Sequence, residues 1–111
     1  MTDKYISRPE EFVLLAVWKL KDNAYGITIR KSIQEMTGKY WSIGAVYVPL
    51  ERLEKKGLLT STNSNPSPER GGRRKRLFRI TPAGIKELDV LYRINSVLWN
   101  GYPALSSEKN K

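Results

Sequence analysis

Positive charge is concentrated in one short stretch of the sequence, between Glu69 and Thr81. Six basic side chains and no acidic one lie between Arg70 and Arg79, whereas the whole chain has 20 basic and 11 acidic residues and a net charge of +9. Like charges at this density repel one another, so a run that is only solvated would cost stability, and a polyanion such as nucleic acid is the natural partner. The six basic residues are Arg70, Arg73, Arg74, Lys75, Arg76 and Arg79.

Residues that could carry out catalysis are few. The chain has no cysteine and no histidine, which removes thiolate metal sites, disulfides and the commonest proton shuttle. The acidic residues are scattered, with no paired spacing that suggests acid and base roles, and no glycine-rich phosphate fingerprint is present. We therefore expect neither an enzyme nor a metal or cofactor site.

Length and composition favour one small globular unit. The chain has 111 residues, of which 40% are hydrophobic, enough for a real but small core. The N-terminus lacks the order of a signal peptide, and the longest apolar run, Phe12 to Trp18, is too short to cross a bilayer. These features predict a cytoplasmic protein.

Capping signals predict two helices in the first part of the chain. Ser7 and Glu10 have the spacing of a capping box, and the helix that they open is expected to run to about Lys21. Asn23 is a plausible cap for the second helix, and Gly38 is well placed as the left-handed residue just after its end.

A third helix is expected over residues 42–56, from the cap Ser42 to the stop at Gly57. Val46, Leu50 and Leu53 fall at i, i+4 and i+7 and should point inward. A DNA major groove admits a helix whose other side is small or polar, although an ordinary surface helix explains the same pattern. That other side consists of Gly44, Ala45, Tyr47, Val48, Glu51, Arg52 and Lys55.

A β-hairpin and a last helix complete the chain. Strands are expected over residues 58–63 and 74–81, joined by a turn rich in Ser, Asn, Pro and Gly. Thr81 and Pro82 supply a cap and a first position for a helix that extends to about Asn100. A lone hairpin is marginally stable in water, so it must pack against the helices.

The last helix has more apolar surface than so small a domain can easily cover. Apolar residues recur along it at spacings of three and four, as in a coiled coil. This surface predicts a homodimer, although Trp99 and Tyr102 could instead fold back on their own subunit. The interface is expected to comprise Leu14, Trp18, Leu88, Leu91, Tyr92, Asn95, Leu98, Trp99 and Tyr102.

Three helices, a hairpin with a long basic turn and a fourth helix are the order of a winged helix-turn-helix protein. The predicted fold class is therefore mainly α with a small β-hairpin, a winged helix-turn-helix domain plus a C-terminal dimerisation helix. We expect the DNA-binding domain over residues 1–80, the dimerisation helix over residues 81–103 and a disordered tail over residues 104–111.

The chain also resembles the PadR-type transcriptional regulators, over roughly residues 11–91. Each matching piece is short, but the ordered set is specific. Two departures stand out: Ala45 occupies a place where many members have threonine, and Pro49 comes one place later than the proline often found after the motif tyrosine. The matching pieces are Tyr25-Gly26, Trp41 to Tyr47, Leu50 to Glu54, Lys56 to Leu59, Gly71 to Lys75 and Arg79 to Gly84.

The resemblance implies a dimeric winged-helix repressor of the short branch of the family. It implies a recognition helix in the major groove and a basic wing, residues 64–76, on the DNA backbone or in the minor groove. It also implies that a small aromatic effector acts near the dimer interface, where Trp99 and Tyr92 could stack on it. The DNA-binding residues expected in all are Tyr25, Ser42, Gly44, Ala45, Tyr47, Arg52, Arg70, Arg73, Arg74, Lys75 and Arg76.

Other kinds of partner fit parts of the same pattern. A winged helix can serve protein contact, in which case the basic arm would bind an acidic partner protein. RNA binding is compatible with the charge, but the sequence predicts no aromatic sheet platform for stacked bases. Double-stranded DNA remains the expected partner.

Overall fold

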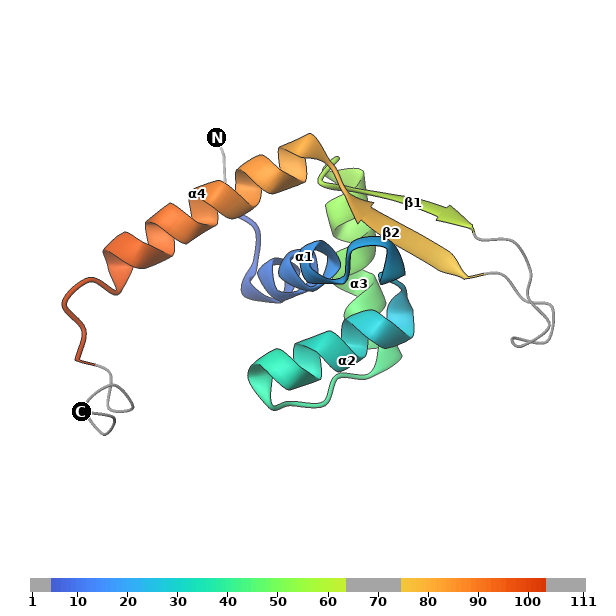
Figure 1. The fold of residues 1–111 in the computed structure, drawn as a ribbon, viewed down its shortest axis with the longest axis horizontal. Coiled ribbons are helices and arrows are strands. Elements are labelled where there is room, and N and C mark those ends of the chain that lie inside the picture. The colour runs from blue at the N-terminus through green and yellow to red at the C-terminus, as the bar shows by residue number, and fades with distance from the viewer. Residues whose placement is uncertain (1–4, 64–74, 104–111) are drawn as a thin grey trace.

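Three short helices form a bundle, and a two-stranded hairpin and a long final helix extend from it in different directions (Figure 1). The computed structural model describes residues 5–63 and 75–103. The mainly helical fold with one hairpin confirms the predicted fold class. Within those residues the elements are α1 (Arg8–Leu20), the 3-10 turn η1 (Lys21–Asn23), α2 (Gly26–Thr37), α3 (Ile43–Lys55), β1 (Leu59–Asn63), β2 (Arg76–Ile80) and α4 (Pro82–Leu98).

The predicted caps open three of these helices. The Glu10 amide donates to Ser7 Oγ at 3.2 Å while the Ser7 amide donates to Glu10 Oε1 at 2.7 Å, so the capping box of α1 is confirmed. Ser42 opens α3 by accepting a hydrogen bond from the Ala45 amide at 3.1 Å. Thr81 opens α4 in the same way.

The prediction of Asn23 as the cap of α2 is wrong. The N-cap is Tyr25, whose amide donates to Thr28 Oγ1 at 3.0 Å. Asn23 ends η1 instead, and its carbonyl accepts a hydrogen bond from the same Thr28 hydroxyl at 2.6 Å. At the other end, Gly38 has φ +75° and closes α2 in the left-handed conformation, as expected.

The core lies where α1, α2 and α3 meet the hairpin. The predicted inward side of α3 is confirmed, since Val46, Leu50 and Leu53 are completely buried. Phe78 brings β2 onto this core: its side chain is buried and its amide donates to the Ala24 carbonyl at 2.8 Å. The hairpin therefore does not stand alone but is held by the bundle.

Leu14 does not form the outward strip that the sequence suggested. It is completely buried, because α1 is packed by α2, α3, β2 and α4 and both of its apolar sides are covered within the chain. Only Trp18 of the predicted pair is exposed, at 42%. Leu15, half-buried beside Trp18, takes the place expected for Leu14.

The final helix α4 is supported along part of its length. Leu91 is buried against the rest of the chain, whereas Val97 and Leu98 are 76% and 71% exposed. The helix ends at Leu98, slightly earlier than expected, and Gly101 follows with φ +85°. None of the helices in the described segments has the length and apolar character needed to cross a bilayer.

One residue, Thr81, fixes the junction between the hairpin and α4. Its hydroxyl accepts from the Gly84 amide at 3.0 Å and donates to the Gly57 carbonyl at 2.7 Å, and its amide donates to the Leu58 carbonyl at 3.1 Å. The end of β2, the start of α4 and the turn after α3 are thereby joined.

A second link joins the start of α1 to the end of α3. The Glu10 carboxylate is almost fully buried, and Lys56 Nζ lies 3.1 Å from both of its oxygens. Burial alone would raise the pKa of Glu10, but the hydrogen bonds from Ser7 and the charge of Lys56 outweigh it and hold the pKa below its usual value.

Replacing Gly84 with alanine should destabilise the fold. A Cβ there would lie 2.6 Å from Ile80 Cγ1 and against the Leu58 carbonyl, so backbone must move. We expect a loss of about 1–3 kcal/mol in the free energy of unfolding, measured by urea denaturation. Gly44→Ala is the matched control, since its nearest atom lies at 4.0 Å, and it should be neutral or stabilising by up to about 1 kcal/mol.

Replacing Glu10 with glutamine should destabilise the fold in a pH-dependent way. We expect a loss of about 1.5–3 kcal/mol near pH 7. Because the folded-state pKa is depressed, this stabilisation is complete above the ordinary value of 4.5 and is lost as the pH falls through the folded-state pKa. Unfolding curves across this pH range test it. A loss that persists unchanged in acid, or an equal loss in the exposed control Glu35→Gln, would contradict the assignment.

Candidate nucleic-acid interface

The outward side of α3 carries most of the residues expected to bind DNA from this helix. Ser42, Gly44, Ala45 and Arg52 are all exposed. Val48, one turn beyond Gly44, is 53% exposed and belongs to the same strip, although it was not among the predicted contacts. Its helical spacing from Gly44 had placed it on this side of the helix, but nothing in the sequence was a reason to predict a contact for an apolar side chain.

Nothing in residues 5–63 and 75–103 explains the lack of a side chain at Gly44. A Cβ added there would meet no atom closer than Ser42 Oγ at 4.0 Å, so the fold itself leaves room for alanine. Small residues at the start of an exposed helix allow its backbone to approach another surface closely. The strip is therefore shaped for close approach by a partner.

Tyr47 is half-buried and joins three elements. Its ring lies edge-on to Phe78 of β2, with centroids 6.3 Å apart. It also packs on the start of α2, since a Cβ added at Gly26 would lie only 2.9 Å from Tyr47 Cε2. Two separate segments that match the family pattern, Tyr25-Gly26 and Trp41 to Tyr47, are thereby in contact. A DNA contact by Tyr47 remains a prediction.

Tyr25 lies next to the base of the wing. The Lys75 ammonium is 4.1 Å from the centroid of the Tyr25 ring, a cation–π distance. Tyr25 is the N-cap of α2, and Lys75 comes just before β2. Both were expected to contact DNA. The structure brings them together at one place.

Arg76 is turned toward α3. Its Nη2 lies 2.6 Å from Glu54 Oε1, and its Nη1 lies 3.7 Å from Glu51 Oε2. Its Nε also donates to Ser61 Oγ at 3.2 Å. These pairings were not foreseen from the sequence. The other predicted wing residues, Arg70, Arg73 and Arg74, lie outside the described residues.

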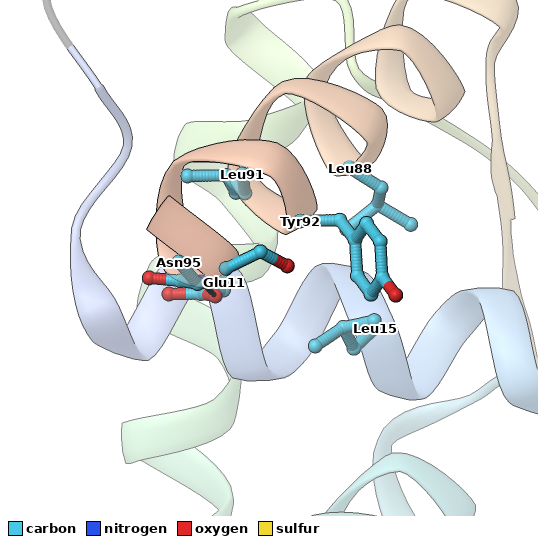
Figure 2. Close-up of a pocket in the computed structure, with 7 residues that line it drawn as sticks. Glu11, Leu15, Leu88, Leu91, Tyr92 and Asn95 are labelled. Carbon is cyan, nitrogen blue, oxygen red and sulfur yellow. Dashed lines mark hydrogen bonds between the residues drawn. The ribbon is translucent and has the colours of Figure 1, made fainter. Parts of the chain in front are cut away.

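A separate groove lies between α1 and α4 (Figure 2). It has a volume of about 300 Å³ and is mainly apolar. Asn95 Nδ2 donates to Glu11 Oε2 at 2.9 Å at one end of it. The lining residues are Glu11, Leu15, Leu88, Leu91, Tyr92, Asn95 and Ser96.

This groove divides the residues expected at a dimer interface. Leu88, Leu91 and Asn95 face α1 of their own chain, which explains their partial or complete burial. Leu14 is buried in the core, and the remaining five are exposed. The rings of two of these, Trp99 and Tyr102, meet edge to face with centroids 5.2 Å apart. The exposed members are Trp18, Tyr92, Leu98, Trp99 and Tyr102.

A helical bundle whose third helix has an exposed side, with a hairpin beside it, is the winged-helix fold, which is common among DNA-binding proteins. The chain is more particular than that. It belongs to the PadR-like family of transcriptional regulators, whose profile matches residues 14–90. The protein is therefore a DNA-binding regulator, and its family is one of transcription regulators, not of enzymes.

Solved structures share this fold. A PadR family transcription regulator from Clostridium difficile is 25% identical, with a TM-score of 0.68 over 86% of this chain and 98% of its own. A PadR family regulator from Eggerthella lenta is 29% identical, with a TM-score of 0.66 over 80% of this chain and 75% of its own. No curated protein matches the chain.

A more distant structure shows the same fold. It is Bordetella bronchiseptica BpsR, whose DNA binding is regulated by 6-hydroxynicotinic acid. It is 20% identical, with a TM-score of 0.64 over 93% of this chain and 72% of its own.

Proposed function

We propose that the protein is a homodimeric, sequence-specific repressor that acts in the cytoplasm and places α3 in the DNA major groove. The observation that carries this proposal is the uncovered strip on α3, which has a small head at Gly44 and Ala45 and a cation at Arg52. A major groove about 12 Å wide accepts such a helix, and bases are read there by groups on its outer side. A dimer bound in this way would exclude the transcription machinery from the same DNA.

The basic segment 64–76 would act as the wing. Its base lies beside both α2 and α3, through Lys75 over the Tyr25 ring and Arg76 on Glu54. The preceding arginines would then follow the DNA backbone or enter the flanking minor groove. They are Arg70, Arg73 and Arg74. Phosphate contacts of this kind supply most of the affinity and make it sensitive to salt.

Dimerisation would use α4. Val97 and Leu98 are exposed on adjacent positions, and Trp99 and Tyr102 extend the apolar surface past the helix end. A second copy related by a two-fold axis would cover this surface, with Trp18 at its edge. Two recognition helices could then enter successive major grooves about 34 Å apart.

A small aromatic effector is the third part of the proposal. Tyr92 is 75% exposed and lines the groove between α1 and α4, so one face of its ring is open to a planar molecule. The aromatic regulator of BpsR supports the idea that this fold can respond to such a compound. Trp99 would contribute from the end of α4. Packing of both rings in the dimer core is the competing explanation.

Arg73 and Arg74 can be replaced with alanine to test the wing. Salt dependence of binding to a random duplex should flatten, by about one unit of slope for each arginine that binds a phosphate. Fluorescence anisotropy at several salt concentrations measures the slope. Lys86→Ala, which removes one exposed charge from α4, is the control. A slope that the double substitution leaves unchanged would remove the wing from the proposal.

Leu98→Glu tests the dimer. Because Leu98 is exposed in the isolated chain, the added charge should leave the fold intact, but burying it against a second copy would weaken association by about a hundredfold or more. Sedimentation velocity measures the dissociation constant. Lys86→Glu, on the same helix but outside the apolar surface, should remain dimeric. Wild-type protein that sediments as a monomer at all concentrations would contradict the proposal.

Tryptophan fluorescence tests the effector. Titration with 6-hydroxynicotinic acid and with planar cationic or phenolic compounds should quench the emission of the wild type. Tyr92→Ala should bind about tenfold more weakly, since one stacking face is lost. Tyr40→Ala, which removes an exposed ring from the segment before α3, should bind normally. Absence of quenching by every compound would count against the site.

A further inference from the structure

We propose that Arg76 is a positioning residue, which sets the wing against the recognition helix through Glu54 and does not itself bind a phosphate. This inference rests on the proposed docking of α3 and the wing. It reassigns one of the six basic residues of the charged stretch from the DNA to the protein's own frame.

Arg76 makes polar contacts to two elements, and its side chain is 35% exposed. Its Nη2 lies 2.6 Å from Glu54 Oε1 on α3, and its Nε donates to Ser61 Oγ on β1 at 3.2 Å. Ser61 in turn donates to Glu54 Oε2 at 2.8 Å, which closes a ring of three side chains. Such a ring has a defined geometry, because each group both orients and is oriented by the next.

The guanidinium of Arg76 also packs on an aromatic ring. Arg76 Cζ lies 5.0 Å from the centroid of the Phe78 ring, two residues further along the same face of β2. Phe78 is buried, so the position of its ring is fixed by the core. Arg76 is therefore held by a carboxylate on one side and by a fixed aromatic ring on the other.

Neighbouring residues at the base of the wing bind different helices. Lys75 lies over the Tyr25 ring at the start of α2, whereas Arg76 pairs with Glu54 on α3. Because successive side chains of an extended chain point to opposite sides, the base of the wing is braced from both sides. These two contacts hold Lys75 and Arg76 against both helices.

Arg76 also compensates negative charge on the side of α3 that would face DNA. Glu51 is exposed, and its Oε2 lies 3.7 Å from Arg76 Nη1. Without Arg76, the carboxylates of Glu51 and Glu54 would be unpaired close to the phosphates. By neutralising these carboxylates, Arg76 would favour DNA binding without a direct contact of its own.

Glutamine substitutions separate positioning from direct contact. Glu54→Gln removes a negative charge, which by simple electrostatics should strengthen DNA binding. If the carboxylate positions Arg76, binding should instead weaken by about tenfold. Glu35→Gln, an exposed acid on α2, is the matched control and should change affinity by less than about twofold. The probe is a labelled duplex selected from a random pool with the wild-type protein.

The salt slope of Arg76→Gln gives a second readout. If Arg76 only positions the wing, the substitution should lower affinity but leave the salt slope unchanged. If Arg76 binds a phosphate, the substitution should lower the slope by about one per protomer. Arg79→Gln is the matched control, because Arg79 lies on the same strand but pairs with Asp22 at 3.0 Å. The double variant Glu54→Gln with Arg76→Gln should bind more tightly than Arg76→Gln alone, since two amides can still hydrogen-bond and no charge is left unpaired at position 54.

One measurement needs no DNA. In the NMR spectrum of the free protein, the Arg76 Nε proton should exchange with water more slowly than that of Arg79, and Glu54→Gln should abolish the difference. Failure of the wild type to bind any duplex would refute the proposed function and leave this readout intact. Tighter binding by Glu54→Gln, a flattened slope in Arg76→Gln, or equally rapid exchange of both Nε protons would each overturn the inference.

Discussion

The seating of Phe78 in the bundle is the interaction on which the rest of the structure depends. Its ring is buried, it contacts Tyr47 edge-on, and its amide is bonded to the Ala24 carbonyl. A hairpin of two strands would be marginal without such an anchor. Because the anchor joins β2 both to Ala24, just before α2, and to α3, the base of the wing has a fixed place relative to the helix that carries the exposed strip.

Local signals in the sequence were sufficient for most of the fold. Ser7, Ser42 and Thr81 cap the helices as their types and positions indicated, and the buried face of α3 followed from its spacing. The signals failed where long-range packing decided the outcome. Leu14 is buried since α1 is surrounded within its own chain, and no pattern within α1 shows how many neighbours cover it. One failure was local: Tyr25, not Asn23, caps α2, because the Thr28 hydroxyl bonds to the Tyr25 amide and to the Asn23 carbonyl.

The candidate site shows the same division. Residue types and spacing were enough to gather Ser42, Gly44 and Ala45 on one exposed strip. They could not show that Arg76 faces Glu54, because that pair joins positions 22 residues apart through the pairing of β1 with β2. A run of basic residues reports charge, but only the strand geometry distributes those charges between the solvent and the protein.

The bonds made by Thr81 have a mechanical consequence. Its side chain and amide bond to the turn after α3 and to the first turn of α4, so α3 and α4 are held in a fixed relation to each other. If two copies associated through α4, as proposed, the crossing angle of the two α4 helices would set the separation of the two α3 helices. A change of that angle would move the two α3 helices as rigid bodies, without any refolding of the domain.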